Sequence, residues 1–272
     1  MTCPGSSGPI HFNDAQEVRR VSSRGDALAR SKKLTNLKVE TREKLKLVST
    51  ATLMTALYKR GLRNQWIQDV HRINKHSGTM VGEAFTLRYM PAREDLNQLE
   101  VFRDREHPQR KAIEICPSGA VLVIDSRKDP RAASAGSILI SRLMVRGAAG
   151  IVTDGGFRDT PEIEKLGIPA YHNRPSAPTN LTLHQAIDIN VPIGCGDTPV
   201  FPGDVIVGDD EGVAVIPAHL ADDIAEEAVE MTAYEDFVTE EVINGRSILG
   251  LYPATDEQSL VDYKAWRQRA GR

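Results

Sequence analysis

The stretch AVLVIDSRKDPRAASAGSILISRLMVRGAAGIVT, residues 120–153, decides the fold. It begins with an apolar run typical of a buried strand, within Ala120–Arg127, and ends with a second β-favouring run, Ile151–Thr153. Between these runs a helix is expected to begin at Gly136 and Ser137. Its predicted apolar stripe consists of Ile138, Leu139, Leu143 and Met144. A strand, a helix and a strand at this spacing predict a crossover unit with two parallel strands.

Other segments extend this pattern in both directions. We expect a helix from Val48, capped by Ser49 or Thr50 and ended by Gly61, and then a half-buried strand over residues 82–90. The charged stretch 91–115 reads as an excursion from the core that contains one short helix. Residues 186–217 are short β-runs broken by Gly, Pro and Asp, and residues 220–231 predict an amphipathic helix.

Composition restricts the class of protein. The 272 residues are 40% hydrophobic and 26% charged, which is ordinary for a globular chain that buries a core. A net charge of −3 argues against a dedicated nucleic-acid binder, and no apolar run is long enough to span a membrane. Three scattered cysteines and the lack of a recognisable secretory signal favour a cytoplasmic location.

Charge is nonetheless distributed unevenly along the chain. Residues 17–46 contain ten Lys and Arg against four acids, whereas residues 209–241 contain twelve acids and no Lys or Arg. The basic stretch could be a nucleic-acid or partner-binding arm. We favour the other interpretation, a solvated helix that packs on the acidic face of a neighbouring subunit, because the total charge is close to neutral.

A dense polar cluster follows the second strand, in IVTDGGFRDT, residues 151–160. The carboxyl end of a strand beside a crossover helix is the usual place for a ligand. Arg158 offers a planar fork that fits a carboxylate, and Asp159 offers oxygen ligands suited to Mg²⁺ or Mn²⁺. The alternative is a surface Arg–Asp pair in an ordinary turn, with Thr160 as the cap and Pro161 as the first helical residue.

The start of the preceding helix strengthens the first alternative. At Gly136, Ser137, Ile138 and Leu139 the backbone N–H groups of a first helical turn are available to an anion. If the parallel strands bring the two loops side by side, a small carboxylate would lie between this helix N-terminus and Arg158. A metal ion would then lie on Asp159.

These residues resemble a known family. AGSILISRLMVRGAAGIVTDGGFRD, residues 135–159, is similar to the signature of the class II pyruvate aldolases related to 4-hydroxy-4-methyl-2-oxoglutarate aldolase, a superfamily that includes the regulator of ribonuclease activity A. Gly136 and Arg158 keep the family spacing of twenty-one intervening positions. The motifs STATLMTALYKRG, GEAFTLR, NVPIGCG and PGDVIVGDDEGVAVIP follow in the family order. We divide the chain into an arm with a basic helical extension (1–47), an RraA-like aldolase domain (48–238) and a C-terminal extension (239–272).

The resemblance implies a fold and a mechanism. The fold is α/β, a three-layer β/β/α swivelling-domain sandwich with mixed sheets, here extended at both termini and assembled as a homotrimer or hexamer. Arg158 and the amides of residues 137–139 would hold the carboxylate and ketone of a pyruvyl group. Asp159 would bind Mg²⁺, Mn²⁺ or Co²⁺, directly or through water, as a Lewis acid for the enolate.

One position departs from the family pattern. Many family aldolases have an acid directly after the helix-opening glycine, where this chain has Ser137. Asp125, at the end of its strand, or Asp154, beside the cluster, could replace that acid. The family also uses a carboxylate from a neighbouring subunit's C-terminal helix, and Glu235 is the best match.

Several other residues are weaker candidates. His172 and His184 could contact substrate or metal, and Arg174 could bind a second carboxylate or a hydroxyl, although such residues are more often structural. Asp209–Gly212 lacks the spaced acids of a calcium loop and is expected to be a hairpin turn. Cys195 has no evident base beside it in sequence, so we do not assign it as a nucleophile.

The sequence thus predicts a metal-dependent lyase that cleaves a small 2-oxo acid by retro-aldol reaction to give pyruvate. By resemblance the preferred substrate is a 2-keto-3-deoxy sugar acid or a 4-hydroxy-2-oxo acid. The alternatives are a non-catalytic regulator that binds an RNA-degrading enzyme, and a decarboxylase or dehydratase that uses the same enolate. No nucleic acid or membrane is expected as a partner.

Overall fold

The computed structural model describes residues 37–75 and 77–271. All of them belong to one compact unit, Thr35–Arg272. Most of the predicted N-terminal arm, residues 1–36, lies outside the described residues. No helix in the described part of the chain is long and apolar enough to cross a membrane.

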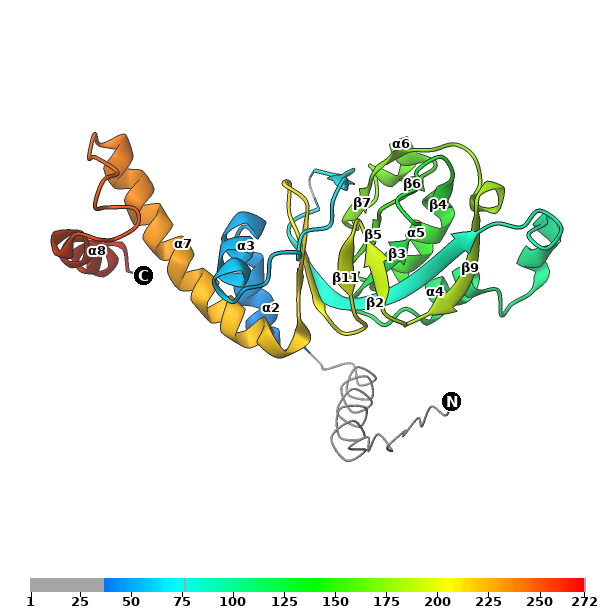
Figure 1. Cartoon of the computed structure of the whole chain (residues 1–272), viewed down its shortest axis with the longest axis horizontal. Helices are drawn as coiled ribbons and strands as arrows, with labels where there is room; N and C mark the ends of the chain where they lie inside the picture. Colours follow the sequence, from blue (N-terminus) through cyan, green and yellow to red (C-terminus); the bar gives the residue numbers. More distant parts are fainter. Residues whose placement is uncertain (1–36, 76, 272) are drawn as a thin grey trace, which may run out of the picture. The chain divides into compact units, whose positions relative to one another are not determined.

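The centre of the unit is an eight-stranded mixed sheet (Figure 1). Its strands, in spatial order, are β1 (His71–Arg72), β7 (Ala170–His172), β5 (Gly150–Thr153), β3 (Ala120–Asp125), β2 (Met80–Pro91), β12 (Val205–Gly208) and β13 (Val213–Ile216), and β9 (His184–Ile189) also pairs with β2. The pairs β2–β3, β3–β5 and β5–β7 are parallel, and the other pairs are antiparallel. The predicted crossover between β3 and β5 is therefore confirmed.

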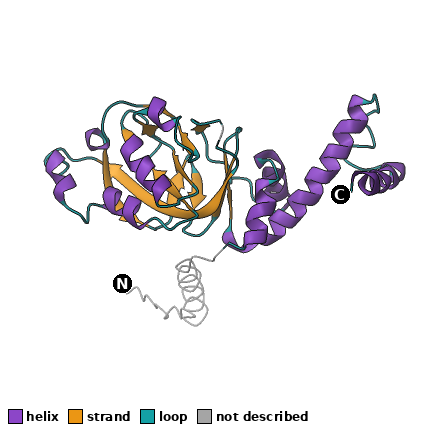
Figure 2. Ribbon diagram, turned by 180° about the vertical axis from the view of Figure 1, so that it is seen from behind, coloured by secondary structure: helices purple, strands orange, loops and turns teal. Residues whose placement is uncertain are grey.

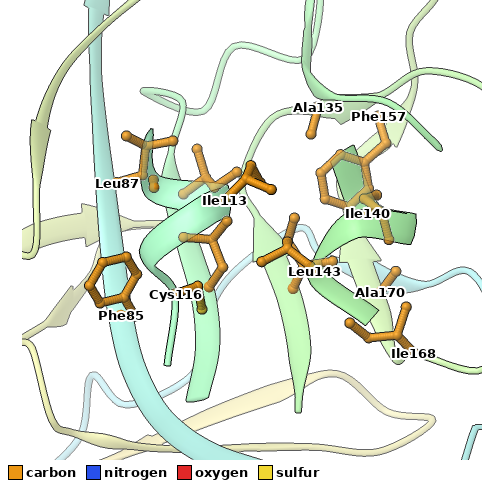
Figure 3. Close-up of a cluster of buried hydrophobic side chains, with 14 of the residues drawn as sticks. Phe85, Leu87, Ile113, Cys116, Ala135, Ile140, Leu143, Phe157, Ile168 and Ala170 are labelled. Carbon is orange, nitrogen blue, oxygen red and sulfur yellow. The ribbon is translucent and has the colours of Figure 1, made fainter. Parts of the chain in front are cut away.

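Alternate residues of the central strands face two different layers. Leu122 and Ile124 of β3 belong to one buried cluster with residues of α4 (Pro108–Ile115) and α5 (Ser137–Val145). Figure 3 shows part of this cluster, including Ile113 of α4 and Ile140 and Leu143 of α5. Val121 and Val123 pack on the other side against the hairpin of β10 (Ile193–Cys195) and β11 (Thr198–Val200). Figure 2 shows helices covering one face of the sheet. The predicted three-layer β/β/α architecture is confirmed.

Two burial predictions were wrong for one reason, which is that tertiary contacts override local periodicity. The expected stripe of α5 included Ile138 and Met144, which are 81% and 36% exposed, whereas the buried positions are Ile140 and Leu143. The strand β2 was expected to be half-buried, but most of its residues are buried on both faces because it lies between two layers.

A helical layer covers the β12–β13 edge of the sheet. The helices α2 (Val39–Lys46), α3 (Thr50–Lys59) and α7 (Ala221–Ile243) share a buried apolar cluster with β2, β12 and β13. Ser49 caps α3 by accepting from the Thr52 N–H, as predicted. The helix α8 (Glu257–Ala270) packs on α7 through Phe237 and Trp266. Residue 238, the predicted domain boundary, lies inside α7.

Lysines in and just before the basic helix α2 form ion pairs with acids of α7 in the same chain. Lys38 pairs with Asp222, and Lys44 pairs with Glu226, both on α7. The prediction of a neighbouring subunit's acidic face was therefore wrong for these lysines. The acidic stretch and the basic stretch are far apart in sequence, and the packing of α2 on α7 brings them together.

The remaining elements lie around the sheet. A small parallel sheet consists of β4 (Ala133–Ala135), β6 (Gly156–Phe157) and β8 (Arg174–Pro175), and α6 (Thr160–Ile163) follows β6. The excursion contains the 3₁₀ helix η1 (Leu99–Arg103) before α4, and two further 3₁₀ turns are η2 (Asn180–Thr182) and η3 (Ala218–Leu220). Figure 1 shows the excursion projecting beyond the end of β2.

Candidate active site

A pocket of about 230 Å³ opens beside the N-terminus of α5. Its lining comes from three segments that are distant in sequence: the β4–α5 junction, the turn after β6, and a wall formed by η1, α4 and η2. The lining residues are Phe102, Gln109, Arg110, Ala133, Ala135, Gly136, Ile138, Leu139, Arg158, Asp159, Thr179 and Asn180.

The small sheet brings the two predicted loops together. The parallel strands β4 and β6 pair with Ala135 opposite Phe157, so that the residue after each strand reaches the same edge. The Arg158 N–H donates to the Ala135 carbonyl at 3.1 Å. Asp159 has a left-handed backbone (φ 60°) and is the residue that precedes α6. The prediction that Thr160 caps this helix was wrong, because Thr160 is already its first residue.

Asp159 makes polar contacts with both Ser137 and Arg158. Its Oδ2 accepts from the Ser137 N–H and the Ser137 Oγ, each at 3.3 Å. Its Oδ1 lies 3.5 Å from Arg158 Nε, and both side chains are partly exposed to the pocket side. Gly136 makes this approach possible: a Cβ there would lie 2.7 Å from Arg158 Cγ and 2.8 Å from Asp159 Oδ2.

The first turn of α5 supplies a free donor. The Ser137 N–H donates to Asp159, and the Leu139 N–H donates to the Gly136 carbonyl at 3.1 Å. Within the described residues the Ile138 N–H has no acceptor. Since the N-terminus of a helix attracts anions, this amide is the one that could bind a ligand oxygen.

The sequence analysis did not predict the part of the pocket lining that comes from η1, α4 and η2. Arg110 lies with its guanidinium carbon 4.3 Å from the centre of the Phe102 ring. Gln109 donates to the Tyr89 hydroxyl at 3.0 Å and to the Ser134 carbonyl at 2.7 Å. No motif marks these residues, because their place at the pocket depends on how the excursion folds back on β9 and η2. The only sequence signal was the excursion itself.

The described lining of this pocket offers a divalent cation one carboxylate. Asp159 is the one acid among the described lining residues, and no group of three or more His, Cys, Asp or Glu occurs in the described part of the chain. Mg²⁺ often keeps several waters and takes one or two carboxylates together with substrate oxygens. Asp159, water and a bound oxo acid would match that preference.

Comparison with known proteins assigns the chain to a family. The family described as RraA-like, Aldolase/RraA, matches residues 50–215, more than half of the chain. The chain belongs to the RraA-like family. Streptomyces coelicolor RraAS2, described as an unusual member of the RNase ES inhibitor RraA protein family, is 27% identical to this chain. The structural match has a TM-score of 0.66 and covers 75% of this chain and 97% of that one.

The curated relatives match a shorter part of this chain than RraAS2 does. A relative from Halalkalibacterium halodurans is 34% identical over 126 residues, which is 46% of this chain and 60% of that protein. The 4-hydroxy-4-methyl-2-oxoglutarate aldolase of Thermus thermophilus is 29% identical over 44% of this chain and 71% of its own length. A Pseudomonas syringae protein shares the fold, with a TM-score of 0.71 at 21% identity over 81% of this chain and 96% of that one.

The two acids considered as substitutes at Ser137 lie elsewhere in this RraA-like chain. Neither is among the described residues that line the pocket. Asp125 accepts from the Arg127 N–H at 2.8 Å, and burial raises the pKa of its carboxyl. Asp154 is buried and accepts from the N–H groups of Ser126, Lys128 and Gly196. Burial raises the pKa of Asp154 to about 6. Asp154 therefore joins the loop after β3 to the turn between β10 and β11, which is a structural role.

The histidines also have structural partners. His172 is 6% exposed, stacks on Phe157 and accepts from the Phe157 N–H through Nδ1 at 3.3 Å. Burial lowers the pKa of His172 to about 4, so the ring is neutral at pH 7. His184 stacks on Tyr89 and lies 3.0 Å from the Asp129 carbonyl through Nε2. His172, His184 and the exposed Arg174 are not among the described lining residues, although His172 supports the strand that precedes Arg158.

The remaining candidates have defined places as well. Glu235, on α7, accepts from the Thr52 hydroxyl at 2.9 Å and the Tyr252 hydroxyl at 3.2 Å, and it does not line the pocket within the described chain. Asp209–Gly212 is the predicted turn between β12 and β13. Cys195 is fully buried, and burial raises the pKa of its thiol, which agrees with leaving it out of the site.

Proposed function

We propose that the protein is a lyase that cleaves a small hydroxylated 2-oxo acid by retro-aldol reaction and releases pyruvate. The convergence of Arg158, Asp159 and the free Ile138 N–H on one pocket carries this proposal. The close approach of Arg158 and Asp159 to Gly136, where a Cβ would lie 2.7 Å from Arg158 Cγ, places both side chains beside the helix N-terminus and supports a binding site over an isolated surface pair. The substrate is a 2-keto-3-deoxy sugar acid or a 4-hydroxy-2-oxo acid.

Each residue has a task in the reaction. The guanidinium of Arg158 binds the substrate carboxylate with two parallel hydrogen bonds, and the Ile138 N–H donates to the ketone oxygen. The substrate hydroxyl loses its proton to water, the neighbouring C–C bond breaks, and its electron pair moves onto the pyruvyl fragment. The resulting enolate is protonated at carbon and leaves as pyruvate. Arg158 and the Ile138 N–H stabilise the oxyanion while it exists.

Asp159 would hold a divalent cation, which supplies Lewis-acid chemistry when bound. Ser137 lacks the carboxylate that many family aldolases have at this position, and Asp125 and Asp154 are committed to other contacts. By likeness to the family, Glu235 of a neighbouring copy would join Asp159 in orienting the water that accepts the hydroxyl proton, although within its own chain Glu235 accepts from the Thr52 and Tyr252 hydroxyls. The likeness to RraAS2 favours a second candidate, a non-catalytic protein that binds an RNA-degrading enzyme. A decarboxylase or dehydratase would use the same carboxylate-binding residues.

A coupled assay separates these functions. Pyruvate release from a panel of 2-oxo acids is followed with lactate dehydrogenase, with and without Mg²⁺. We expect release from a hydroxylated oxo acid that stops with a chelator and returns with Mg²⁺, Mn²⁺ or Co²⁺. Full activity in excess chelator after dialysis contradicts the metal. No turnover of any member of the panel contradicts the lyase.

A further inference from the structure

The loop between β3 and β4, residues 126–132, has an unusual backbone. Arg127 and Lys128 have φ angles of 60° and 54°, so two consecutive residues with side chains adopt the left-handed conformation. Residues other than glycine rarely adopt it, because it brings the side chain too close to the backbone. A loop of this kind keeps its shape only where contacts from the surrounding structure hold it.

The carboxylate of Asp154 makes two of these contacts. Its Oδ1 accepts from the Ser126 N–H at 2.7 Å, and its Oδ2 accepts from the Lys128 N–H at 3.1 Å. Asp125 adds a bond of the same kind, in which its Oδ1 accepts from the Arg127 N–H at 2.8 Å. Two carboxylates therefore bind the consecutive amides of the left-handed segment, and hydrogen bonds to a charged acceptor are the stronger kind.

Asp154 lies where the two chain segments that carry the pocket leave the central sheet. The strand β5 ends at Thr153, directly before Asp154, and the same segment continues through β6 to Arg158. The loop 126–132 leads in the same way from β3 through β4 to Gly136. The Asp154 carboxylate therefore bonds the segment that carries Arg158 to the segment that carries Gly136.

The packing around this carboxylate leaves little room for the two segments to shift independently. The hydroxyls of Ser126, Ser134 and Thr153 belong to fully buried residues and lie 2.6–3.1 Å from one another. Gly155 lies so close that a Cβ there would be 2.6 Å from Ser126 Cβ. Since closely packed side chains transmit small movements, a change at Asp154 is expected to reach β4 and β6.

We propose that Asp154 is a positioning residue of the pocket. Its ionised carboxylate holds the loop 126–132 in the left-handed form, and this loop sets the position of Gly136 and the N-terminus of α5 relative to Arg158. Asp154 is 1% exposed and acts through these residues, without touching the substrate. The effect on ligand binding rests on the proposed function, which assigns the substrate carboxylate to Arg158.

The same arrangement gives the site a dependence on pH. Burial is the largest cause that raises the pKa of Asp154, to about 6, and the Asp125 carboxyl raises it further, whereas the accepted amides lower it. Of the other groups near this acid, Lys128 pairs with Asp197, and burial raises the pKa of the Cys195 thiol, which is therefore neutral. Above pH 6 the ionised carboxylate holds the loop, and as the pH falls towards 5 protonation weakens that hold.

Hydrogen–deuterium exchange of the full-length protein tests this role without any ligand. Asp154→Asn keeps the shape of the side chain but cannot ionise. At pH 8 this variant should exchange several-fold faster than the wild-type protein in residues 126–132, and also in residues 133–140 and 156–160. At pH 5 the two proteins should exchange alike, because the wild-type carboxyl is then protonated. An increase confined to residues 126–132, or a difference that persists at pH 5, contradicts the proposal.

The wild-type protein alone gives a second test, which covers the case in which the variant does not fold. Exchange of residues 133–140 is compared with exchange of α3, after correction of both for the chemical exchange rate at each pH. The ratio should rise several-fold from pH 8 to pH 5, and a constant ratio overturns the proposal.

Asp204→Asn is the matched control. Asp204 is another buried acid whose pKa burial raises, and it accepts from the N–H groups of Phe201 and Ala218. It is not among the described residues that line the pocket. Its replacement should therefore leave exchange of residues 133–140 and 156–160 unchanged.

Calorimetric binding of pyruvate with Mg²⁺ at pH 8 connects the loop to the site. Asp154→Asn should weaken binding by about tenfold, because the binding groups are displaced, whereas Asp204→Asn should not. Equal affinity of the wild-type protein and Asp154→Asn shows that the positioning role is wrong and leaves the proposed function standing. If pyruvate does not bind the wild-type protein, the proposed function is contradicted, and the exchange data still decide whether Asp154 positions β4 and β6.

Discussion

At the scale of single residues, Arg158 is the sharpest test of the proposed function. Arg158→Lys should keep the fold but lose most activity, because lysine supplies a point charge where a carboxylate needs a planar two-pronged donor. The expected cost is about 2–4 kcal/mol, or roughly 30- to 1,000-fold in rate. Asp159→Asn should be at least as harmful and should not be rescued by more substrate. Kinetics and thermal unfolding on the same samples check this, and a near-wild-type rate in Arg158→Lys contradicts it.

Gly136 gives a second test, in which a methyl group disturbs the same site. In Gly136→Ala the new Cβ would lie 2.7 Å from Arg158 Cγ, so Arg158 and Asp159 must move. A shift of about 1 Å in a binding group can cost on the order of 100-fold in rate. The control is Gly167→Ala, where the added Cβ meets nothing within 4 Å. Equal kinetics in the two variants would show that the Gly136 contact is irrelevant to turnover.

His172 predicts a pH dependence of stability. Its pKa is lowered from 6.5 to about 4, mainly by burial, so the unfolded chain binds the proton more tightly than the folded one. The stabilising contribution is present above pH 6.5 and is lost as the pH falls towards 4, by up to about 3 kcal/mol. His172→Gln keeps an acceptor for the Phe157 N–H but does not titrate. Urea unfolding between pH 4 and 7 should show a smaller loss at acid pH in the variant than in the wild-type protein, and parallel curves would contradict the assignment.

At the scale of elements, the cap of α3 is a measurable local interaction. Ser49 accepts from the Thr52 N–H at 3.1 Å, and the helix belongs to the α2–α3–α7 cluster. Ser49→Ala should lower the free energy of unfolding by about 1 kcal/mol, whereas Ser49→Asn should restore most of it. Because Ser49 neither lines the pocket nor bonds to Glu235, kcat of the folded protein should be unchanged. A fall in kcat without a change in stability would mean that the helix acts at the site.

Elements also show what could be predicted from the sequence. The strands β3 and β5 and the start of α5 were predictable, because apolar runs and a helix-opening Gly136 are local signals. The spacing of Gly136 and Arg158 then indicated one half of the pocket. The Arg110 half was not predictable, because it depends on hydrogen bonds from Asn97 to residues far along the chain. The exposure of Ile138 was missed for a similar reason, since α5 packs through Ile140 and Leu143.

At the scale of the whole molecule, Glu235 connects activity to assembly. If the acid completes the pocket of a neighbouring copy, active preparations should be trimers or hexamers by light scattering. Glu235→Gln and Arg158→Lys should each be poorly active alone, but mixed oligomers of the two should regain activity, because some sites then receive an intact residue from each copy. An active, strictly monomeric preparation, or no recovery on mixing, would remove Glu235 from the site.

The two ends of the pocket belong to parts of the chain with different freedom to change. Arg158 and Gly136 follow strands of the small sheet beside the core, where even a methyl group is excluded. Arg110 and Phe102 belong to the projecting stretch between β2 and β3, most of whose residues before α4 are exposed. Transplanting residues 91–110 between relatives would therefore be expected to redirect which compounds are accepted while the bond-breaking chemistry is inherited intact. In an engineering campaign, this stretch is the place to randomise.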